Sequence, residues 1–145
     1  MTRLAATPID VGDLDELANV LSVAGLPTAD LREPSRAFFR FDDETGLVGF
    51  GGLEGDGADR LLRSLVVIPN RRGLRLGRAM LVLTEQEARR LGVERLHLLT
   101  DSAAPFFRTN GYSDADRGVA PGPIATSREF TALCPASATY LVKVL

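Results

Sequence analysis

The sequence contains a single cysteine, Cys134, and no tryptophan in 145 residues. One cysteine cannot form a disulfide within the chain, so a disulfide-stabilised scaffold is excluded. No apolar run approaches the roughly 20 residues that a transmembrane helix needs, and residues 1–13 lack the apolar core of a signal peptide. These absences predict a cytoplasmic protein without a membrane segment.

The chain is nevertheless long and apolar enough to bury a core. With 45% hydrophobic and 25% charged residues, its composition is ordinary for a globular protein. Its length corresponds to one domain, at roughly 150 residues per domain. We therefore expect residues 1–145 to form a single domain.

Lysine is also scarce, because Lys143 is the only one and arginine supplies every other cation. The net charge of −2 disfavours general nucleic-acid binding, as does the lack of aromatic residues among the basic ones. A cluster of arginines between positions 60 and 78 favours a small anionic ligand; the alternative is that it only solvates a helix start. Its members are Arg60, Arg63, Arg71, Arg72, Arg75 and Arg78.

The spacing of apolar residues predicts both helices and strands. Apolar residues recur three and four apart over 13–24 and 75–91, which predicts two amphipathic helices. A short helix is expected at 103–109, and strands at 37–41, 47–53, 61–68, 96–100 and 139–144. The strands on either side of the long helix should run parallel. The expected fold class is α/β (α+β), with a mixed, mostly antiparallel central sheet flanked by helices.

The segment from Leu65 to Arg78 joins an apolar strand, a basic turn with glycine and the start of the long helix. Glycine lets a backbone approach a ligand closely, and a helix start offers unpaired N–H groups and the positive end of its dipole. These features suit a pyrophosphate, although neither the P-loop nor the dinucleotide-binding pattern is present. A strand–helix connection without a ligand is the alternative.

Two parts of this region match a family pattern. The pattern is Gln or Arg, two variable residues, Gly, one variable residue, and Gly or Ala, at the start of a long helix. Arg72 and Gly77 match its ends, whereas Arg75 replaces the middle glycine and is expected to keep helical dihedral angles. Residues 103–112 are similar to the family's following element. The sequence thus resembles the GNAT superfamily of acetyl-CoA-dependent N-acetyltransferases.

The resemblance implies a GNAT domain over residues 1–145 and transfer of an acetyl group from acetyl-CoA to a small, anionic amine acceptor. We expect no metal ion, no nucleic acid and no membrane partner, and a homodimer stays open. The backbone of 65–67 is implied to contact the pantetheine. The residues implied to bind the cofactor are Leu65, Val66, Val67, Arg72, Gly73, Leu74, Arg75, Leu76, Gly77, Arg78, Thr100 and Phe107.

Several peptides along the chain are also similar to the arsenic-resistance N-acetyltransferase subgroup, namely 25–31, 52–54, 62–65, 98–100 and 133–138. This narrower resemblance implies an arsenic-operon context without fixing the acceptor. Cys134 offers one thiolate, which is a weak arsenic site. The alternative for Cys134 is a small buried hydrophobic residue.

The leaving-group position departs from the family. Many relatives carry a tyrosine where this chain has Phe107, which has no hydroxyl to protonate the thiolate, and Thr100 stands where many carry asparagine. This departure raises a second class of function, a CoA-binding sensor or regulatory protein with little or no turnover.

The acceptor side has few candidate residues. Glu54 is expected to be the general base, directly or through a water, with a surface charge as the alternative. Arg63 is expected to bind an anionic group of the acceptor, with pairing to Asp59 or Glu54 as the alternative. His97 is expected to be a core or surface residue rather than a base.

Overall fold

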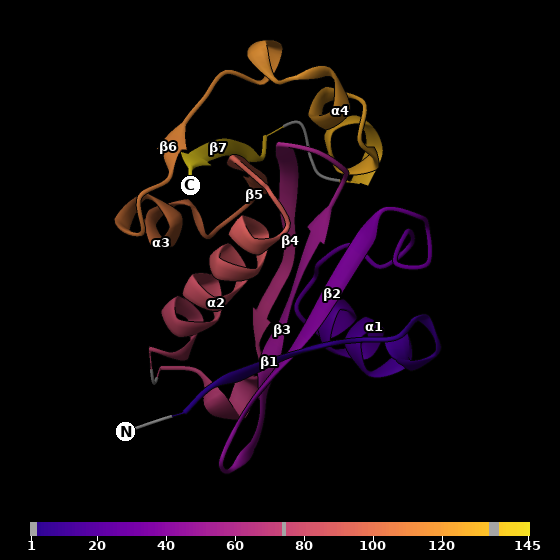
Figure 1. Ribbon diagram of the computed structural model, residues 1–145, viewed down its shortest axis with the longest axis vertical. Helices are drawn as coiled ribbons and strands as arrows, with labels where there is room; N and C mark the ends of the chain where they lie inside the picture. Colours follow the sequence, from indigo (N-terminus) through magenta and orange to yellow (C-terminus); the bar gives the residue numbers. More distant parts are fainter. Residues whose placement is uncertain (1–2, 74, 134–136) are drawn as a thin grey trace.

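The computed structural model describes residues 3–73, 75–133 and 137–145. Seven strands form one sheet in the order β1-β2-β3-β4-β5-β7-β6 (Figure 1). Neighbouring strands are antiparallel except β4 and β5, which confirms the predicted mixed sheet. The strands are β1 (Ala5–Pro8), β2 (Arg36–Asp43), β3 (Gly46–Glu54), β4 (Asp59–Val67), β5 (Arg95–Thr100), β6 (Ser113–Asp114) and β7 (Thr139–Val144).

Helices cover both faces of the sheet (Figure 1). The α-helices are α1 (Leu14–Val23), α2 (Leu76–Arg90), α3 (Ala104–Thr109) and α4 (Gly122–Ala125). Short 3-10 turns occupy Val11–Asp13, Pro69–Arg71 and Arg117–Val119, and a π-helical turn occupies Glu129–Leu133. Among the described residues, no helix has the length and apolar character needed to cross a membrane.

Two apolar cores hold the layers together. On one face, α2 buries Leu76, Met80 and Ala88 against the sheet, and on the other face α1 buries Leu17 and Leu21. Fully burying one such large apolar side chain stabilises the fold by about 1.5–3 kcal/mol. The amphipathic spacing that predicted both helices is therefore the spacing of their buried faces.

The sequence did not indicate β1 and β6. β1 reads Ala-Ala-Thr-Pro and β6 has two residues, so neither shows an apolar alternation. Segment 115–133, with its short helical turns, was also missed, because it has no regular apolar spacing. Each missed element follows from tertiary packing rather than from local pattern.

Pairing between the parallel strands β4 and β5 ends early. Residues 59–61 of β4 pair with 95–97 of β5, whereas β4 continues to Val67 and β5 continues to Thr100. The parallel orientation predicted for these strands is confirmed. Beyond Leu61, the edge of β4 that faces β5 has no ladder partner in β5. Apart from the Val67 carbonyl, which accepts a hydrogen bond from Arg72 Nε, its backbone groups are available to a ligand.

β4 also carries a bulge. Arg63 lies opposite Gly52 and Val66 lies opposite Phe50, so two residues of β4 oppose one residue of β3, and Ser64 has a left-handed φ of 59°. The extra residue inverts the alternation of side chains. Leu62 packs in the core under α2, whereas Val66 packs in the core under α1.

The only lysine lies in a largely buried polar cluster. Lys143 Nζ donates to both carboxylate oxygens of Glu85 at 3.1 Å and to the Asn110 carbonyl at 3.0 Å. The Tyr112 hydroxyl donates to the same carboxylate at 2.9 Å. Burial and the adjacent Glu85 charge raise the pKa of Tyr112. The cluster ties α2 to β7 and to the end of α3.

Candidate functional site

A cavity of about 840 Å³ opens beside the C-terminal half of β4. Its lining combines the end of α1, the last residues of β4, the loop that follows, the first turn of α2, and α3 with its entry. Most of the residues predicted to bind the cofactor line it: Leu65, Val66, Val67, Arg72, Gly73, Arg75, Leu76, Gly77, Arg78 and Phe107. Most residues that the sequence predicted to bind the cofactor therefore line one cavity.

Two residues of the predicted set stand apart. Thr100 is not among the lining residues; its hydroxyl accepts a hydrogen bond from the Ala103 N–H at 3.0 Å, at the start of α3. Leu74 lies outside the described residues, as does Cys134. Thr100 thus fixes the entry to α3 rather than forming the wall.

Sequence reasoning missed other lining residues: Ala24, Leu26, Arg71, Ser102, Ala103, Phe106 and Asn110. Phe106 belongs to the same motif as Phe107 and could have been included on that ground. Ala24 and Leu26 follow directly after α1, and no local signal connects them with α2.

The lining is basic. It contains four arginines and no acidic residue among the described residues: Arg71, Arg72, Arg75 and Arg78. Arg71 is held by the β2–β3 hairpin, and Arg72 Nε donates to the Val67 carbonyl at 3.1 Å. Arg75 and Arg78 make no hydrogen bond or ion pair with any described residue. Their guanidinium groups are therefore available to an anion.

Arg75 does not keep the helical conformation expected for it. Its φ of 60° and ψ of 20° are left-handed, and α2 begins only at Leu76. A non-glycine residue in this region is strained, and glycine adopts it freely. The middle glycine of the family pattern thus meets a backbone requirement at the helix start, which this chain meets with arginine.

The start of α2 is open. No side chain caps its first N–H groups, and its first turn contains no acidic residue. A Cβ on Gly77 would approach Phe106 and Val67 no closer than 3.7 Å. Glycine at position 77 therefore leaves space on the cavity side of α2, although a Cβ there would make only ordinary van der Waals contacts.

The lining that the structure describes contains no acid–base group in this cavity. Phe107 is 7% exposed and packs edge-on against Phe106 and Tyr112, with ring centroids 5.1 and 5.4 Å apart. Apart from the arginines, the polar side chains in its described lining are Ser102 and Asn110. Proton transfer thus requires a group from outside the lining.

Arg63 and Glu54 meet in the core beside this cavity, without lining it. The Arg63 guanidinium donates to Asp30 at 2.6 and 2.7 Å and to Glu54 at 2.7 Å. The alternative of pairing with Glu54 is therefore seen, whereas Asp59 binds Arg95 and His97 instead. The carboxylates of the chain itself occupy the Arg63 donors that were expected to bind an anionic acceptor.

These residues belong to a carboxylate–arginine cluster of Asp30, Arg36, Glu54, Arg63 and Glu129. Arg36 Nη2 lies 2.7 Å from Asp30 Oδ2, 3.5 Å from Glu54 Oε2 and 3.7 Å from Glu33 Oε1. Burial raises the pKa of Asp30, but hydrogen bonds and charge from Arg63 and Arg36 outweigh it and lower this pKa to about 2. Burial also opposes the charge of Arg63, but its carboxylate partners raise its pKa.

Glu129 differs from the other carboxylates of the cluster. It is only 5% exposed, and no described residue donates a hydrogen bond to it. Burial raises its pKa to about 7, against the opposing charge of Arg63. Sequence reasoning missed Asp30, Arg36 and Glu129; Asp30 follows α1 in a turn-rich loop, and Glu129 lies in a segment without apolar periodicity.

His97 is buried in the sheet, as expected for a core residue. Its Nδ1 lies 2.7 Å from the Tyr140 hydroxyl and its Nε2 lies 2.8 Å from Asp59. The Asp59 carboxylate also accepts two hydrogen bonds from Arg95, which lower the pKa of Asp59 to about 2 together with His97, against burial. Both ring nitrogens of His97 are thus occupied.

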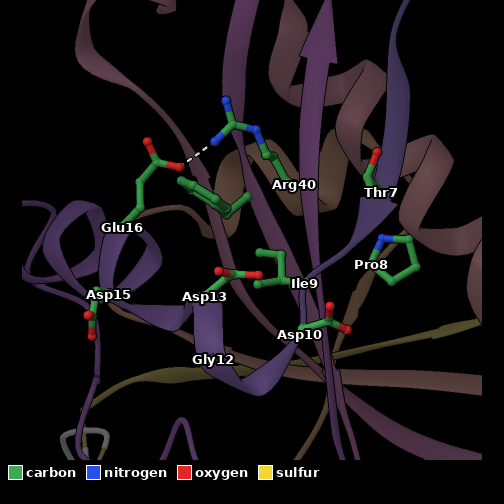
Figure 2. A pocket seen from close by; sticks show the side chains of 10 residues that line it. Thr7, Pro8, Ile9, Asp10, Gly12, Asp13, Asp15, Glu16 and Arg40 are labelled. Carbon is green, nitrogen blue, oxygen red and sulfur yellow. Dashed lines mark hydrogen bonds and ion pairs between the residues drawn. The ribbon is translucent and has the colours of Figure 1, made fainter.

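A second cavity, of about 460 Å³, lies between the end of β1 and the start of α1 (Figure 2). Its charged lining consists of Asp10, Asp13, Asp15, Glu16 and Arg40, and Figure 2 shows Glu16 and Arg40 pointing toward each other in an ion pair. An acidic lining repels a polyanion. A pyrophosphate therefore fits the first cavity and not this one.

Comparisons with solved structures agree with this fold. N-acetylglutamate synthase from Neisseria gonorrhoeae, complexed with coenzyme A and N-acetyl-glutamate, matches 100% of the chain with a TM-score of 0.80 and 18% identity. The chain spans 36% of that protein's length. A putative acyl-CoA N-acyltransferase from Klebsiella pneumoniae matches 98% of the chain and 97% of its own length, with a TM-score of 0.76 and 21% identity.

A protein from Mycobacterium tuberculosis solved in complex with CoA covers 97% of the chain and 99% of its own length, with a TM-score of 0.76 and 17% identity. No curated protein matches the sequence. Residues 34–114, more than half of the chain, match the model of the acetyltransferase (GNAT) domain. The chain therefore belongs to the GNAT acetyltransferase family.

Proposed function

We propose that this protein is an N-acetyltransferase that moves the acetyl group of acetyl-CoA to the amine of a small acceptor. The observation that carries this proposal is the basic cavity, where two free arginines adjoin an uncapped helix start and the unpaired edge of β4. A polyanionic ligand with a long flexible arm fits such a site. Membership of an acetyl-CoA-dependent family supports the same donor.

The cofactor would lie along the cavity in two parts. The N–H groups at the start of α2 would bind the pyrophosphate together with Arg75 and Arg78. The pantetheine would follow the edge of β4 along 65–67, with the apolar side chains of Leu26 and Phe106 beside it. This arrangement directs the thioester into the region where β4 and β5 no longer pair.

The reaction begins when the lone pair of a neutral amine attacks the thioester carbon. The C–S bond then breaks, and the thiolate takes a proton. Holding the two reactants in this geometry supplies much of the rate, and N–H groups along β4 would stabilise the developing oxyanion. Phe107 has no proton for the thiolate, so that proton would come from solvent or from the ammonium group of the acceptor.

Two acceptor classes are proposed for the first tests. The N-acetylglutamate synthase relative was solved with N-acetyl-glutamate, which supports acidic amino acids as the first class. The peptides similar to the arsenic-resistance subgroup support an amine that bears an arsenic oxyanion as the second. Both are small and anionic.

A second function, CoA sensing with little or no turnover, is favoured by one observation. The described lining of the cavity has no acid–base residue, and Phe107 stands at the leaving-group position. Such a protein would bind CoA and acetyl-CoA without consuming either.

One pair of assays separates these functions. Calorimetry measures binding of CoA and acetyl-CoA, and a thiol-detecting assay measures CoA release with acidic amino acids, arsenical amines and polyamines. Binding with acceptor-dependent release supports the enzyme, and binding without release supports the sensor. Failure to bind at millimolar ligand contradicts both.

Matched variants locate the binding site. Gly77→Glu should abolish binding, because it places bulk and negative charge where phosphates approach. Gln86→Glu adds a negative charge at an exposed position of α2 two turns beyond Arg78, away from the cavity, and should leave affinity unchanged.

A further inference from the structure

The carboxylate–arginine cluster has two unfilled hydrogen-bonding groups. Glu129 receives no hydrogen bond from any described residue, and Arg36 Nε is buried without a partner within the described part of the chain. Buried polar groups almost always have partners. The open acceptor at Glu129 therefore indicates a hydrogen-bond donor from outside the described residues. Arg36 Nε, itself a donor, needs a separate acceptor.

The charges of the cluster indicate the sign of that donor's charge. With Glu129 ionised, the cluster and the Glu33–Arg128 pair that touches it through Arg36 leave one excess negative charge. The groups counted are Asp30, Glu33, Glu54 and Glu129 against Arg36, Arg63 and Arg128. An excess buried charge is costly unless it is paired. A protonated amine supplies the missing positive charge and also donates the hydrogen bond that Glu129 lacks.

The cluster lies next to the inner end of the proposed thioester path. Arg63 is two residues beyond Leu61, the last residue of β4 that pairs with β5. It directly precedes the bulge at Ser64, and the cavity wall begins at Leu65. Glu129, whose pKa is lowered by the charge of Arg63, therefore belongs to the cluster that adjoins this wall of the cavity.

We propose that Glu129 is the general base that takes the proton from the ammonium group of the acceptor, a role that rests on the proposed acetyltransferase function. An N–H bond of the ammonium breaks and its proton moves to a carboxylate oxygen of Glu129. The freed lone pair forms the C–N bond, the C–S bond breaks, and the second amine proton and the carboxyl proton leave to the thiolate and to solvent. The net products are the acetamide, CoA thiol and one proton.

The electrostatic surroundings suit this role. The charged groups that face Glu129 are Asp30 from the α1–β2 loop, Arg36 from β2, Glu54 from β3 and Arg63 from β4. Burial and the two carboxylates raise the pKa of Glu129, and the two arginines lower it. The resulting pKa is about 7. A base works best when its pKa lies near the operating pH. Glu54, which Arg63 holds at 2.7 Å, is the weaker candidate.

Glu129→Gln tests the proposal through the pH dependence of kcat/KM. We expect kcat to fall about a hundredfold or more, as for removal of a general base, and the rising limb near pH 7 to disappear. Acetyl-CoA affinity should stay within about twofold of wild type, which a general structural disturbance would not allow. The control Glu94→Gln removes an exposed carboxylate that forms no ion pair with another described residue and should leave kcat and the profile unchanged.

The outcomes are distinguishable. If Glu129→Gln keeps at least half of kcat and the wild-type profile, the proposal is overturned while the enzyme stands. If wild type releases no CoA with any amine, both proposals fail. If Glu129→Gln does not fold, Glu129→Asp replaces it, since moving the carboxylate back by one methylene should lower kcat and shift the limb; an unchanged rate and limb would overturn the proposal.

Discussion

Asp30 accepts two hydrogen bonds from the Arg63 guanidinium, at 2.6 and 2.7 Å, with both side chains fully buried. The two residues are 33 positions apart, so this bidentate pair fastens the α1–β2 loop onto the middle of β4. Leu26 of the same loop lines the basic cavity. The pair therefore helps to fix one wall of the proposed cofactor site.

We expect Asp30→Ala to lower the free energy of unfolding by about 3–5 kcal/mol, because it leaves a buried guanidinium without its main partner. Urea denaturation with circular dichroism measures the loss. Asp15→Ala is the matched control, since it breaks an exposed pair with Arg32 worth at most about 1 kcal/mol. Equal losses in the two variants would contradict the assigned importance of the buried pair.

The same pair makes the protein sensitive to acid. Because the pKa of Asp30 is lowered from 3.8 to about 2, its contribution to stability is present above pH 4 and is lost as the pH falls through 2. Denaturation midpoints of wild type and Asp30→Asn should therefore converge in this range. A constant difference between them down to pH 2 would refute the assignment.

Glu129 should have the opposite pH dependence. Its pKa is raised from 4.5 to about 7, so the folded state holds the proton more tightly and gains stability at low pH. The contribution is complete below about pH 4.5 and is lost as the pH rises through 7, by up to about 3 kcal/mol. Glu129→Gln should flatten this part of the stability profile without acceptor or cofactor present. Parallel profiles for the two proteins would count against a raised pKa.

Arg75→Gly should stabilise the protein. Relief of a left-handed arginine is worth about 1 kcal/mol, and the thermal midpoint measured by calorimetry should rise accordingly. Arg78→Gly removes the same side chain from the exposed helical position three residues later and should destabilise by about 1 kcal/mol. A lower thermal midpoint in both variants would show that the Arg75 side chain stabilises the fold by more than its left-handed backbone destabilises it.

Phe107→Tyr should keep or raise turnover with a confirmed acceptor. The hydroxyl would supply the thiolate with a proton donor that the described cavity lining lacks. Steady-state kinetics together with a melting curve measure the effect. A collapse of kcat with an unchanged melting temperature would mean that the edge-on packing around Phe107 serves another purpose.

Residues close in sequence were predictable, and residues brought together by the fold were not. Helix α2 and its neighbouring strands follow from apolar spacing, and their parallel orientation follows from the handedness of the crossover. The basic loop and Gly77 were identified because strand, turn and helix succeed one another directly. The conformation of Arg75 was not predicted, because a non-glycine residue such as arginine rarely adopts left-handed backbone angles.

The charged cluster illustrates the other case. Arg63 was singled out because it interrupts an apolar strand, but its partner Asp30 lies in a loop whose neighbours give no charge pattern. Glu129 is even less conspicuous, because its burial depends on a segment packing over the sheet. Pairing across distant segments leaves no periodic signal in a single sequence.

The lone lysine has a consequence for the chemistry of the chain itself. A thioester acylates neutral amines, and the ammonium group of Lys143 is held by both oxygens of Glu85 and by the Asn110 carbonyl, with the side chain 23% exposed. Arginine stays protonated and does not compete. The side chains of this protein therefore offer the proposed acetyl-CoA donor almost no target for self-acetylation. Amine-directed labels and lysine cross-linkers should likewise leave its side chains largely unmodified.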